Sequence, residues 1–336
     1  MGAQAPQASA LNDLAPVWHS GPVAIWKVVD EAGVERIDGP SVVTIGVFDG
    51  VHRGHQAVLA AVRRKADELD ATTVAITFDP HPVAVLAPDK APKRLTTIER
   101  RVELLREHGA DEVRVLAFSA EMSAWTPEEF IQRVVVEQVG CRHLIVGENF
   151  RFGKRAAGSV DTLREAGERD GFSVDGWSLV GDEETFSSTR VRSAVAAGDM
   201  PAAAHVLGRP HEVVGTVVQG DRRGRELGYP TANVPVDESF AVPPDGVYAA
   251  RLVLSDGARL PAAVSVGTNP TFEGVSDRRV ESYVLDRDDL GLYDEPVRVE
   301  FVERLRGMVA FDSVDALIAQ MGDDVAAARQ ALDAGH

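Results

Sequence analysis

Short apolar runs alternate with amphipathic segments through the first part of the chain. The apolar runs have the length and the β-branched content of buried strands. They lie at 42–45, 73–78, 112–117 and 143–146. The segments between them space apolar residues as helices do, at 56–69, 97–107 and 127–139. Regular alternation of strand and helix is typical of a parallel sheet with helices on both faces, so we predict a Rossmann-like α/β fold.

The pattern changes after Gly208-Arg209-Pro210, which we interpret as a hinge. Beyond it the apolar runs are short and separated by turn residues, as in an antiparallel sheet or small β-barrel. These predicted strands lie at 212–218, 247–254, 262–266, 280–285 and 297–302, before a closing amphipathic helix at 313–334. We therefore predict an N-terminal extension, an α/β domain and a β-barrel domain with a closing helix, at 1–20, 21–208 and 209–336.

Two shorter predictions complete the pattern. The segment 23–37 is expected to form a hairpin that turns at 30–33. Near the end of the α/β domain, helices are expected at 187–197 and 201–207, because Gly198-Asp199 interrupts an otherwise helical stretch.

The composition limits the classes of protein to which the chain can belong. A length of 336 residues is long for one hydrophobic core, and the hydrophobic fraction of 44% is that of a globular protein. No apolar run approaches the ~18 residues that span a membrane, and residues 1–20 lack the pattern of a secretory signal. The formal net charge of −17 argues against non-specific nucleic-acid binding. The single cysteine, Cys141, excludes an internal disulfide and fits a reducing cytoplasm.

A glycine-rich turn follows the first predicted strand directly. It reads Gly46-Val47-Phe48-Asp49-Gly50-Val51-His52-Arg53-Gly54-His55. Glycines let the backbone approach a ligand, and the helix N-terminus that follows attracts a phosphate. Histidines three apart at a helix start lie on one face, where two imidazoles can stabilise charge at phosphorus. The alternatives for an isolated histidine pair are a metal site or a chance surface pair.

Three other segments of the first domain carry candidate chemistry. Hydroxyls at a helix start, in Ser187-Ser188-Thr189-Arg190-Val191-Arg192, form either an ordinary cap or a clamp for the phosphates of ATP. Asn149 and Asp79 follow predicted strands, where ligands bind in parallel sheets. His81 lies in Asp79-Pro80-His81-Pro82, a loop of unassigned role. The sequence contains neither a P-loop nor a Gly-x-Gly-x-x-Gly motif.

The second domain holds a glycine- and arginine-bearing loop followed by a polar strand. It reads Gly220-Asp221-Arg222-Arg223-Gly224-Arg225-Glu226-Leu227-Gly228-Tyr229-Pro230-Thr231-Ala232-Asn233. Such a loop can wrap a polyphosphate through its N–H groups. Thr231 and Asn233 are two apart, so on an extended segment they face the same side and could complete a Mg²⁺ shell. The alternative is a flexible hairpin. Glu281 lies on an alternating strand in line with Tyr283, and a lone carboxylate there is usually just solvated.

The motifs of the first domain resemble those of the nucleotidyltransferase superfamily, and more narrowly the bacterial bifunctional riboflavin kinase/FAD synthetase (FMN adenylyltransferase) family. The histidines match its H-x-G-H signature, residues 147–153 match G-x-N/D-F-x-F-G, and residues 186–192 match I-S-S-T-x-I-R with Phe186 in place of isoleucine. The resemblance implies that His52 and His55 are catalytic. It also implies nucleotide or phosphate contacts by Gly46, Phe48, Asp49, Gly50, Gly54, Asn149, Ser188, Thr189 and Arg192.

The motifs of the second domain resemble those of the riboflavin kinase half of the same family. Residues 230–233 match the end of its G-x-x-L-G-[FY]-P-T-A-N motif in full. The match of residues 281–285 to E-[ST]-[YFH]-[VL]-L implies that Glu281 is the general base. Carried over residue by residue, the resemblance further implies phosphate contacts by Gly224, Gly228 and Pro230, metal ligation by Thr231 and Asn233, and flavin contacts by Asn269 and Arg306.

The resemblance implies a cytoplasmic enzyme that makes FMN from riboflavin and ATP, and then FAD and pyrophosphate from FMN and a second ATP. Mg²⁺ is the implied cofactor, and riboflavin, FMN, FAD and ATP are the implied small-molecule partners. We expect no nucleic-acid or membrane partner, and a monomer or weak homo-oligomer. Two other hypotheses stay open at this point: an enzyme with one inactive domain, and a flavin- or nucleotide-sensing protein without turnover.

Overall fold

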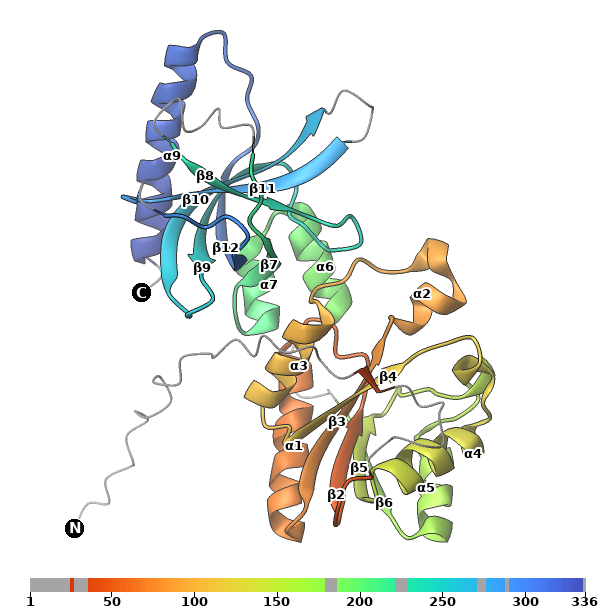
Figure 1. Ribbon diagram of the computed structural model, residues 1–336. Coiled ribbons are helices and arrows are strands. Elements are labelled where there is room, and N and C mark those ends of the chain that lie inside the picture. The colour runs from red at the N-terminus through yellow and green to blue at the C-terminus, as the bar shows by residue number, and fades with distance from the viewer. Residues whose placement is uncertain are drawn as a thin grey trace, which may run out of the picture. The chain divides into compact units, whose positions relative to one another are not determined.

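A computed structural model describes residues 25–26, 36–178, 186–220, 229–270, 276–287 and 290–334 of the chain. It divides into two compact units, each described by itself below (Figure 1). The α/β unit comprises Pro22–His211 together with the short segment Asp237–Pro244. The β unit comprises Glu212–Val236 and Asp245–His336.

The α/β unit is built on a six-stranded parallel sheet. Its strands are β1 (Ile25–Trp26), β2 (Ser41–Ile45), β3 (Thr72–Asp79), β4 (Glu112–Ala117), β5 (Cys141–Gly147) and β6 (Ser173–Trp177). The strand order is β1-β4-β3-β2-β5-β6, and every pairing is parallel. From β2 the chain adds β3 and then β4 on one side of β2, whereas β5 and β6 lie on its other side. The order therefore reverses between β2 and β5, and ligands of open α/β sheets bind at such a switch point.

Helices cover both faces of this sheet, as predicted (Figure 1). The helical segments are α1 (Arg53–Leu69), α2 (Pro82–Leu86), η1 (Pro88–Lys90), α3 (Ile98–Glu107), η2 (Met122–Ala124), α4 (Pro127–Phe130), η3 (Ile131–Gln138), η4 (Lys154–Ala156), α5 (Val160–Asp170), α6 (Ser188–Ala197) and α7 (Met200–Leu207). One core joins Val43 and Ile76 of the sheet to η3 and α5. On the opposite face, α1 packs on Val42 and α3 packs near Ala75.

Several local predictions need correction. The hairpin expected at 23–37, with its turn at 30–33, lies mostly outside the described residues; within them, Ile25–Trp26 pairs in parallel with β4, and residues 36–37 belong to no strand. The helix predicted at 127–139 changes from α to π geometry at Ile131. Helix α5 and strand β6 were missed as elements: α5 has only a short apolar stripe, and β6 has no buried residue that would mark it as a strand.

The β unit is a six-stranded antiparallel sheet that curls into a half-barrel. Its strands are β7 (His211–Thr216), β8 (Thr231–Pro235), β9 (Gly246–Val253), β10 (Arg259–Pro270), β11 (Ser276–Val284) and β12 (Pro296–Arg306), in the order β7-β12-β9-β10-β11-β8. Beyond the end of β7, Val218 pairs with Asn233 of β8, so the two end strands of the sheet approach each other. The closing helix α9 (Val314–Ala334) packs Ala328 and Leu332 on this sheet (Figure 1).

Among the described residues, we find no helix with both the length and the apolar character needed to cross a membrane.

Candidate active sites

The turn between β2 and α1 has an unusual backbone. Phe48 and Val51 are buried and lie at φ values of 50° and 39°, and Gly50 lies at 84°. Such left-handed conformations cost free energy in residues with a side chain and concentrate at functional sites. The turn is held by Arg209, which donates to the Gly50 carbonyl at 2.9 Å, and by Gln56, which donates to the Val51 carbonyl at 2.9 Å. A rigid turn thus presents its side chains at the switch point of the sheet.

The two histidines of this turn lie face to face, as the sequence predicted. Helix α1 begins at Arg53, three residues before the predicted start, so His52 is its N-cap. The rings of His52 and His55 stack with centroids 3.6 Å apart, and Phe48 meets His55 edge-on at 5.1 Å. Gly54 makes room for the pair, because a Cβ at Gly54 would lie 3.1 Å from the His52 ring. The His52 side chain makes no capping hydrogen bond, so the positive end of the helix is not occupied by its own cap.

Both imidazoles are neutral near pH 7. Burial lowers the pKa of His52 to about 4, and the cations of Arg192 and Arg209 lower it further, against the opposing effect of Asp49. Burial also lowers the pKa of His55 well below its usual value, and His52 and Arg101 add to this effect. The Nδ1 atoms of both rings are buried without a hydrogen-bond partner among the described residues. The pair can therefore donate hydrogen bonds to a phosphate without carrying a charge.

The lowered pKa of His52 predicts a pH-dependent loss of stability. An unfolded histidine titrates near 6.5, so between about pH 6.5 and 4 the unfolded chain binds more protons than the native chain. The contribution of His52 to the free energy of unfolding is therefore fully present above about pH 6.5. It falls by about 3 kcal/mol as the pH drops through this window. His52→Asn should remove this part of the dependence. Urea unfolding of both proteins at several pH values would measure the difference, and an identical slope would contradict the neutral state of His52.

Asp49 is fully engaged by protein groups. Its carboxylate, 2% exposed, accepts hydrogen bonds from the backbone N–H groups of Leu95 and Thr96 at 3.0 and 3.3 Å. It also pairs with Arg192 at 2.5 Å, and Arg101 lies at 3.7 Å. The contact of Asp49 with nucleotide stays a prediction; the contacts seen here tie the turn to the segment after η1 and to α6. The sequence offered no signal for Arg101, one of three arginines on the amphipathic helix α3.

The hydroxyl and arginine residues of the second motif lie beside this turn. Ser187 is the N-cap of α6 and accepts from the Arg190 N–H at 3.2 Å. Ser188 donates to the Asp49 carbonyl at 2.8 Å, and Thr189 is exposed. Arg192 donates through Nε to the Lys93 carbonyl at 2.6 Å. The fold therefore brings a second helix N-terminus to the histidine turn, although the two motifs are far apart in the sequence.

Two further loops border the same edge of the sheet. Asn149 is exposed in the loop after β5, the neighbour of β2, and its Oδ1 lies 3.2 Å from the position of a Gly147 Cβ. His81 follows β3, and its Nδ1 accepts from the Val83 N–H at 3.1 Å. The neutral ring of His81 therefore carries its proton on Nε2. Burial lowers the pKa of His81, and Arg192 and Arg101 act in the same direction against Asp49.

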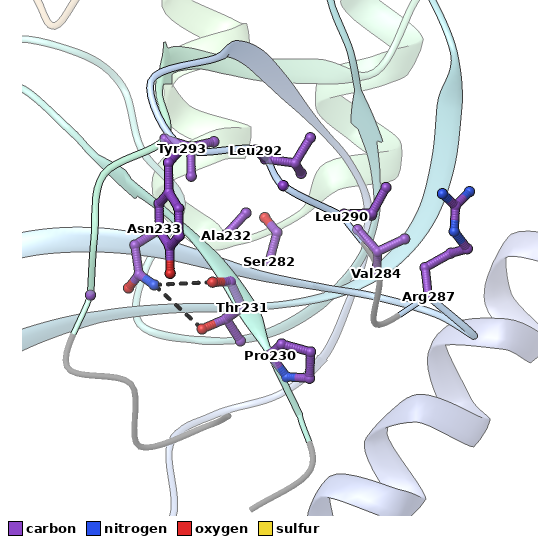
Figure 2. Close-up of a pocket in the computed structure, with 13 residues that line it drawn as sticks. Pro230, Thr231, Ala232, Asn233, Ser282, Val284, Arg287, Leu290, Leu292 and Tyr293 are labelled. Atoms are coloured by element: carbon purple, nitrogen blue, oxygen red, sulfur yellow. Dashed lines mark hydrogen bonds between the residues drawn. The ribbon is translucent and has the colours of Figure 1, made fainter. Parts of the chain in front are cut away.

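The candidate residues of the β unit share one face of two neighbouring strands. In the antiparallel register, Asn233 lies opposite Glu281 and Thr231 lies opposite Tyr283. Directly opposite residues project to the same side of a sheet, so all four side chains belong to one face. The Asn233 amide also donates to the Thr231 carbonyl and hydroxyl at 3.3 and 3.4 Å (Figure 2). This agrees with the prediction that Thr231 and Asn233 face the same side.

Two cavities lie along these strands, and Thr231 lines both. The larger, about 340 Å³, is shown in Figure 2 and is lined by residues that include Gly220, Pro230, Asn233, Ser282, Leu292 and Tyr293. The smaller, about 260 Å³, is mainly apolar and is lined by residues that include Tyr229, Glu281, Tyr283, Arg306, Met308 and Met321. A group held at Thr231 can therefore be reached from both cavities.

Arg306 is oriented in the smaller cavity by a residue that sequence reasoning missed. Asp324 of α9 accepts from Nε and Nη2 of Arg306 at 2.7 and 2.6 Å, a bidentate pair. Gln320 donates to the same carboxylate at 3.1 Å. Asp324 is buried, yet in the sequence it is one acidic residue of an amphipathic helix, so no local pattern distinguishes it.

Three predicted residues cannot be placed fully. Gly224 and Gly228 lie outside the described residues. The backbone of Asn269 pairs with Asp277 in β10–β11, and its side chain lies outside the description. Among the described residues, no cluster of three or more histidine, cysteine or acidic side chains could hold a metal. Any metal at Thr231 and Asn233 would therefore draw most of its ligands from phosphate and water.

Comparisons with known proteins match both halves of the chain. A family model described as FAD synthetase matches residues 34–190, and one described as riboflavin kinase matches residues 207–332. A bifunctional riboflavin kinase/FMN adenylyltransferase from Pseudomonas fluorescens is 39% identical over 86% of this chain and 92% of its own length. The protein of the same name from Escherichia coli K12 is 35% identical over the same shares. A crystal structure of a macrolide-efflux protein from Streptococcus pneumoniae is 31% identical, with a TM-score of 0.78 over 87% of this chain and 95% of that one.

Proposed function

This chain belongs to the family of bifunctional riboflavin kinases/FMN adenylyltransferases and carries both activities, and from that premise we propose how its residues divide the two reactions. We assign the adenylyl transfer to residues 21–208 and the kinase reaction to residues 209–336. The observation that carries the kinase assignment is the position of Thr231 between a cavity of mixed polarity and a mainly apolar one.

In the kinase reaction, ATP would occupy the larger cavity and the flavin ring the smaller, apolar one. The γ-phosphate would then lie at Thr231, within reach of both. Glu281 stands opposite Asn233 and lines the flavin cavity, so it would take the proton of the riboflavin 5′-hydroxyl. The hydroxyl oxygen attacks the γ-phosphorus, the bond to the bridging oxygen breaks, and ADP leaves. Arg306, oriented by Asp324, would contact the flavin.

We assign Mg²⁺ to Thr231 and Asn233. The Nδ2 atom of Asn233 lies 3.4 Å from the Thr231 hydroxyl, and a half-turn of the amide would bring its Oδ1 to that side. Two neutral oxygens at the junction of the cavities suit a cation that keeps water and phosphate ligands. Mg²⁺ bound there would offset the negative charge of the transferred phosphoryl group.

In the adenylyl transfer, the FMN phosphate attacks the α-phosphorus of ATP and pyrophosphate leaves, without a covalent enzyme intermediate. The stacked His52 and His55 would donate hydrogen bonds to the α-phosphate as charge builds there. Ser188, Thr189 and the N-terminus of α6 would hold the leaving pyrophosphate together with Arg192. Asn149, beyond β5, would help to place the nucleotide. Electrostatic stabilisation and positioning would account for most of the acceleration.

A single incubation tests this division of roles. Purified protein is incubated with riboflavin, ATP and Mg²⁺, and the flavins are separated by chromatography over time. We expect FMN first and FAD second, and we expect chelation of Mg²⁺ by EDTA to stop FMN formation. FMN without FAD would refute the proposed roles of His52 and His55. FMN formation that continues at an unchanged rate in EDTA would refute the metal assignment.

The cytoplasmic location stays a prediction that rests on the single reduced cysteine, and the oligomeric state and the absence of a nucleic-acid partner stay predictions as well. Burial raises the pKa of the Cys141 thiol to about 12, which favours the protonated thiol over the thiolate near pH 7.

A further inference from the structure

A short segment from the sequence of the kinase half belongs to the α/β unit. Asp237–Pro244 connects β8 to β9, yet its contacts place it with the adenylyl-transfer residues. It lies against Lys93, Arg94 and Leu95, the extended stretch that follows η1. We call these two stretches, 93–95 and 237–241, the clasp.

Main-chain and side-chain contacts both hold the clasp together. The Arg94 N–H donates to the Ser239 carbonyl at 2.7 Å, and the Ala241 N–H donates to the Arg94 carbonyl at 2.8 Å. The Arg94 guanidinium lies over the Phe240 ring at 4.1 Å and donates to the Ser239 hydroxyl at 2.7 Å. Lys93 donates through Nζ to the Glu238 carbonyl at 2.6 Å. The peptide groups on both sides of Arg94 are therefore fixed by the segment 237–241.

The other ends of the same two peptide groups face the turn between β2 and α1. The Lys93 carbonyl accepts from Arg192 Nε at 2.6 Å, and the Leu95 N–H donates to both carboxylate oxygens of Asp49 at 3.0 and 3.1 Å. The Leu95 side chain is 3% exposed and packs where a Cβ at Gly50 would meet it at 2.8 Å. The C=O and the N–H of one trans peptide group point in opposite directions, so in an extended stretch they reach opposite edges. One edge of 93–95 thus binds Phe240 and its neighbours, and the other edge orients Asp49 and Arg192.

We propose that the clasp is a positioning element of the adenylyl-transfer site, with Arg94 and Phe240 as its positioning residues. The inference rests on the proposed role of Arg192 toward the leaving pyrophosphate. Loss of the Phe240 ring frees the Arg94 peptide, so the Lys93 carbonyl and the Leu95 N–H no longer hold Arg192 and Asp49 in place. A small displacement of groups that stabilise a transition state reduces its rate strongly.

The test uses the full chain and measures both reactions in each variant. Phe240→Ala and Arg94→Ala should each lower kcat for FAD formation from FMN by about tenfold, more than they change the KM for ATP. FMN formation by the same preparations should stay within about twofold. Phe240→Tyr keeps the ring over Arg94 and should retain activity. Arg133→Ala is the matched control, because it removes a similar cation–π contact, with Trp125 at 4.7 Å, elsewhere in the α/β unit.

A double-mutant cycle distinguishes a positioning role of the clasp from a general loss of folded structure. In an Arg192→Ala background, adding Phe240→Ala should lower FAD formation by less than about twofold, because the clasp acts through Arg192. A full tenfold loss in that background would overturn the inference, as would equal losses of both activities in Phe240→Ala. An Arg192→Ala variant with unchanged FAD formation would instead refute the proposed role of Arg192. If Arg192→Ala lowers FAD formation and Phe240→Ala does not, the proposed role of the clasp is wrong while the proposed role of Arg192 stands.

Discussion

Glu281→Gln is expected to lower the rate of FMN formation by about 10²–10⁴-fold, the usual contribution of a general base. Glutamine keeps the size of the side chain, but it cannot take the proton of the riboflavin hydroxyl. Glu281 lines the smaller cavity beside Tyr283 and stands opposite Asn233, whereas Asp324, the other described carboxylate that lines this cavity, is paired with Arg306. Initial rates of FMN formation at saturating ATP and Mg²⁺ would measure the effect, with the KM for riboflavin expected to change little.

FAD formation from added FMN is the internal control for this variant, because it depends on residues of the α/β unit. Glu303→Gln is a matched control that makes the same change at an exposed position of strand β12. Both controls should leave their activities within about twofold of the wild type. A Glu281→Gln enzyme that keeps more than about a tenth of its FMN formation would contradict the assignment of Glu281 as base.

Replacement of His52 and His55 together by alanine should reduce FAD formation by about 10²–10³-fold or more. The stacked rings lie at the N-terminal end of α1. In the proposed reaction they would donate hydrogen bonds to the α-phosphate as charge develops there. Water that enters the vacated space can donate hydrogen bonds, but it is not preorganised. Conversion of FMN and ATP to FAD and pyrophosphate would be followed by chromatography, and FMN formation from riboflavin should continue.

A suitable control for the loss of buried imidazoles is His143→Ala. His143 is buried on β5 and bonds Ser173 and Asp175 at 2.5 and 2.9 Å, away from the loop that carries Asn149. Thermal unfolding of both variants would show whether lost stability explains lost activity. The catalytic role of the histidine pair would be untenable if the double alanine variant and His143→Ala lost FAD formation to the same extent.

Local patterns were enough to predict most of the architecture. The period of apolar residues distinguished the parallel sheet from the antiparallel one, and it placed the strands that lead into the Gly46 and Gly147 segments close to their observed bounds. The same-face predictions for His52 with His55 and for Thr231 with Asn233 also agree with the structure, because both depend only on helix and strand geometry. Elements were missed where local signals were weak, as at α5 and β6.

By itself, the sequence determined which residues are candidates for chemistry and, for most of them, the kind of element that carries each. The tertiary structure alone decided which of them meet: that Asp49 binds Leu95 and Arg192, that Asp324 orients Arg306, and that a segment from the second half of the chain completes the clasp. The physical reason is the difference in sequence separation between the interacting residues. Periodicity and caps arise from interactions within a few residues, whereas these pairs are joined across 18 to 145 positions by packing that no local pattern records.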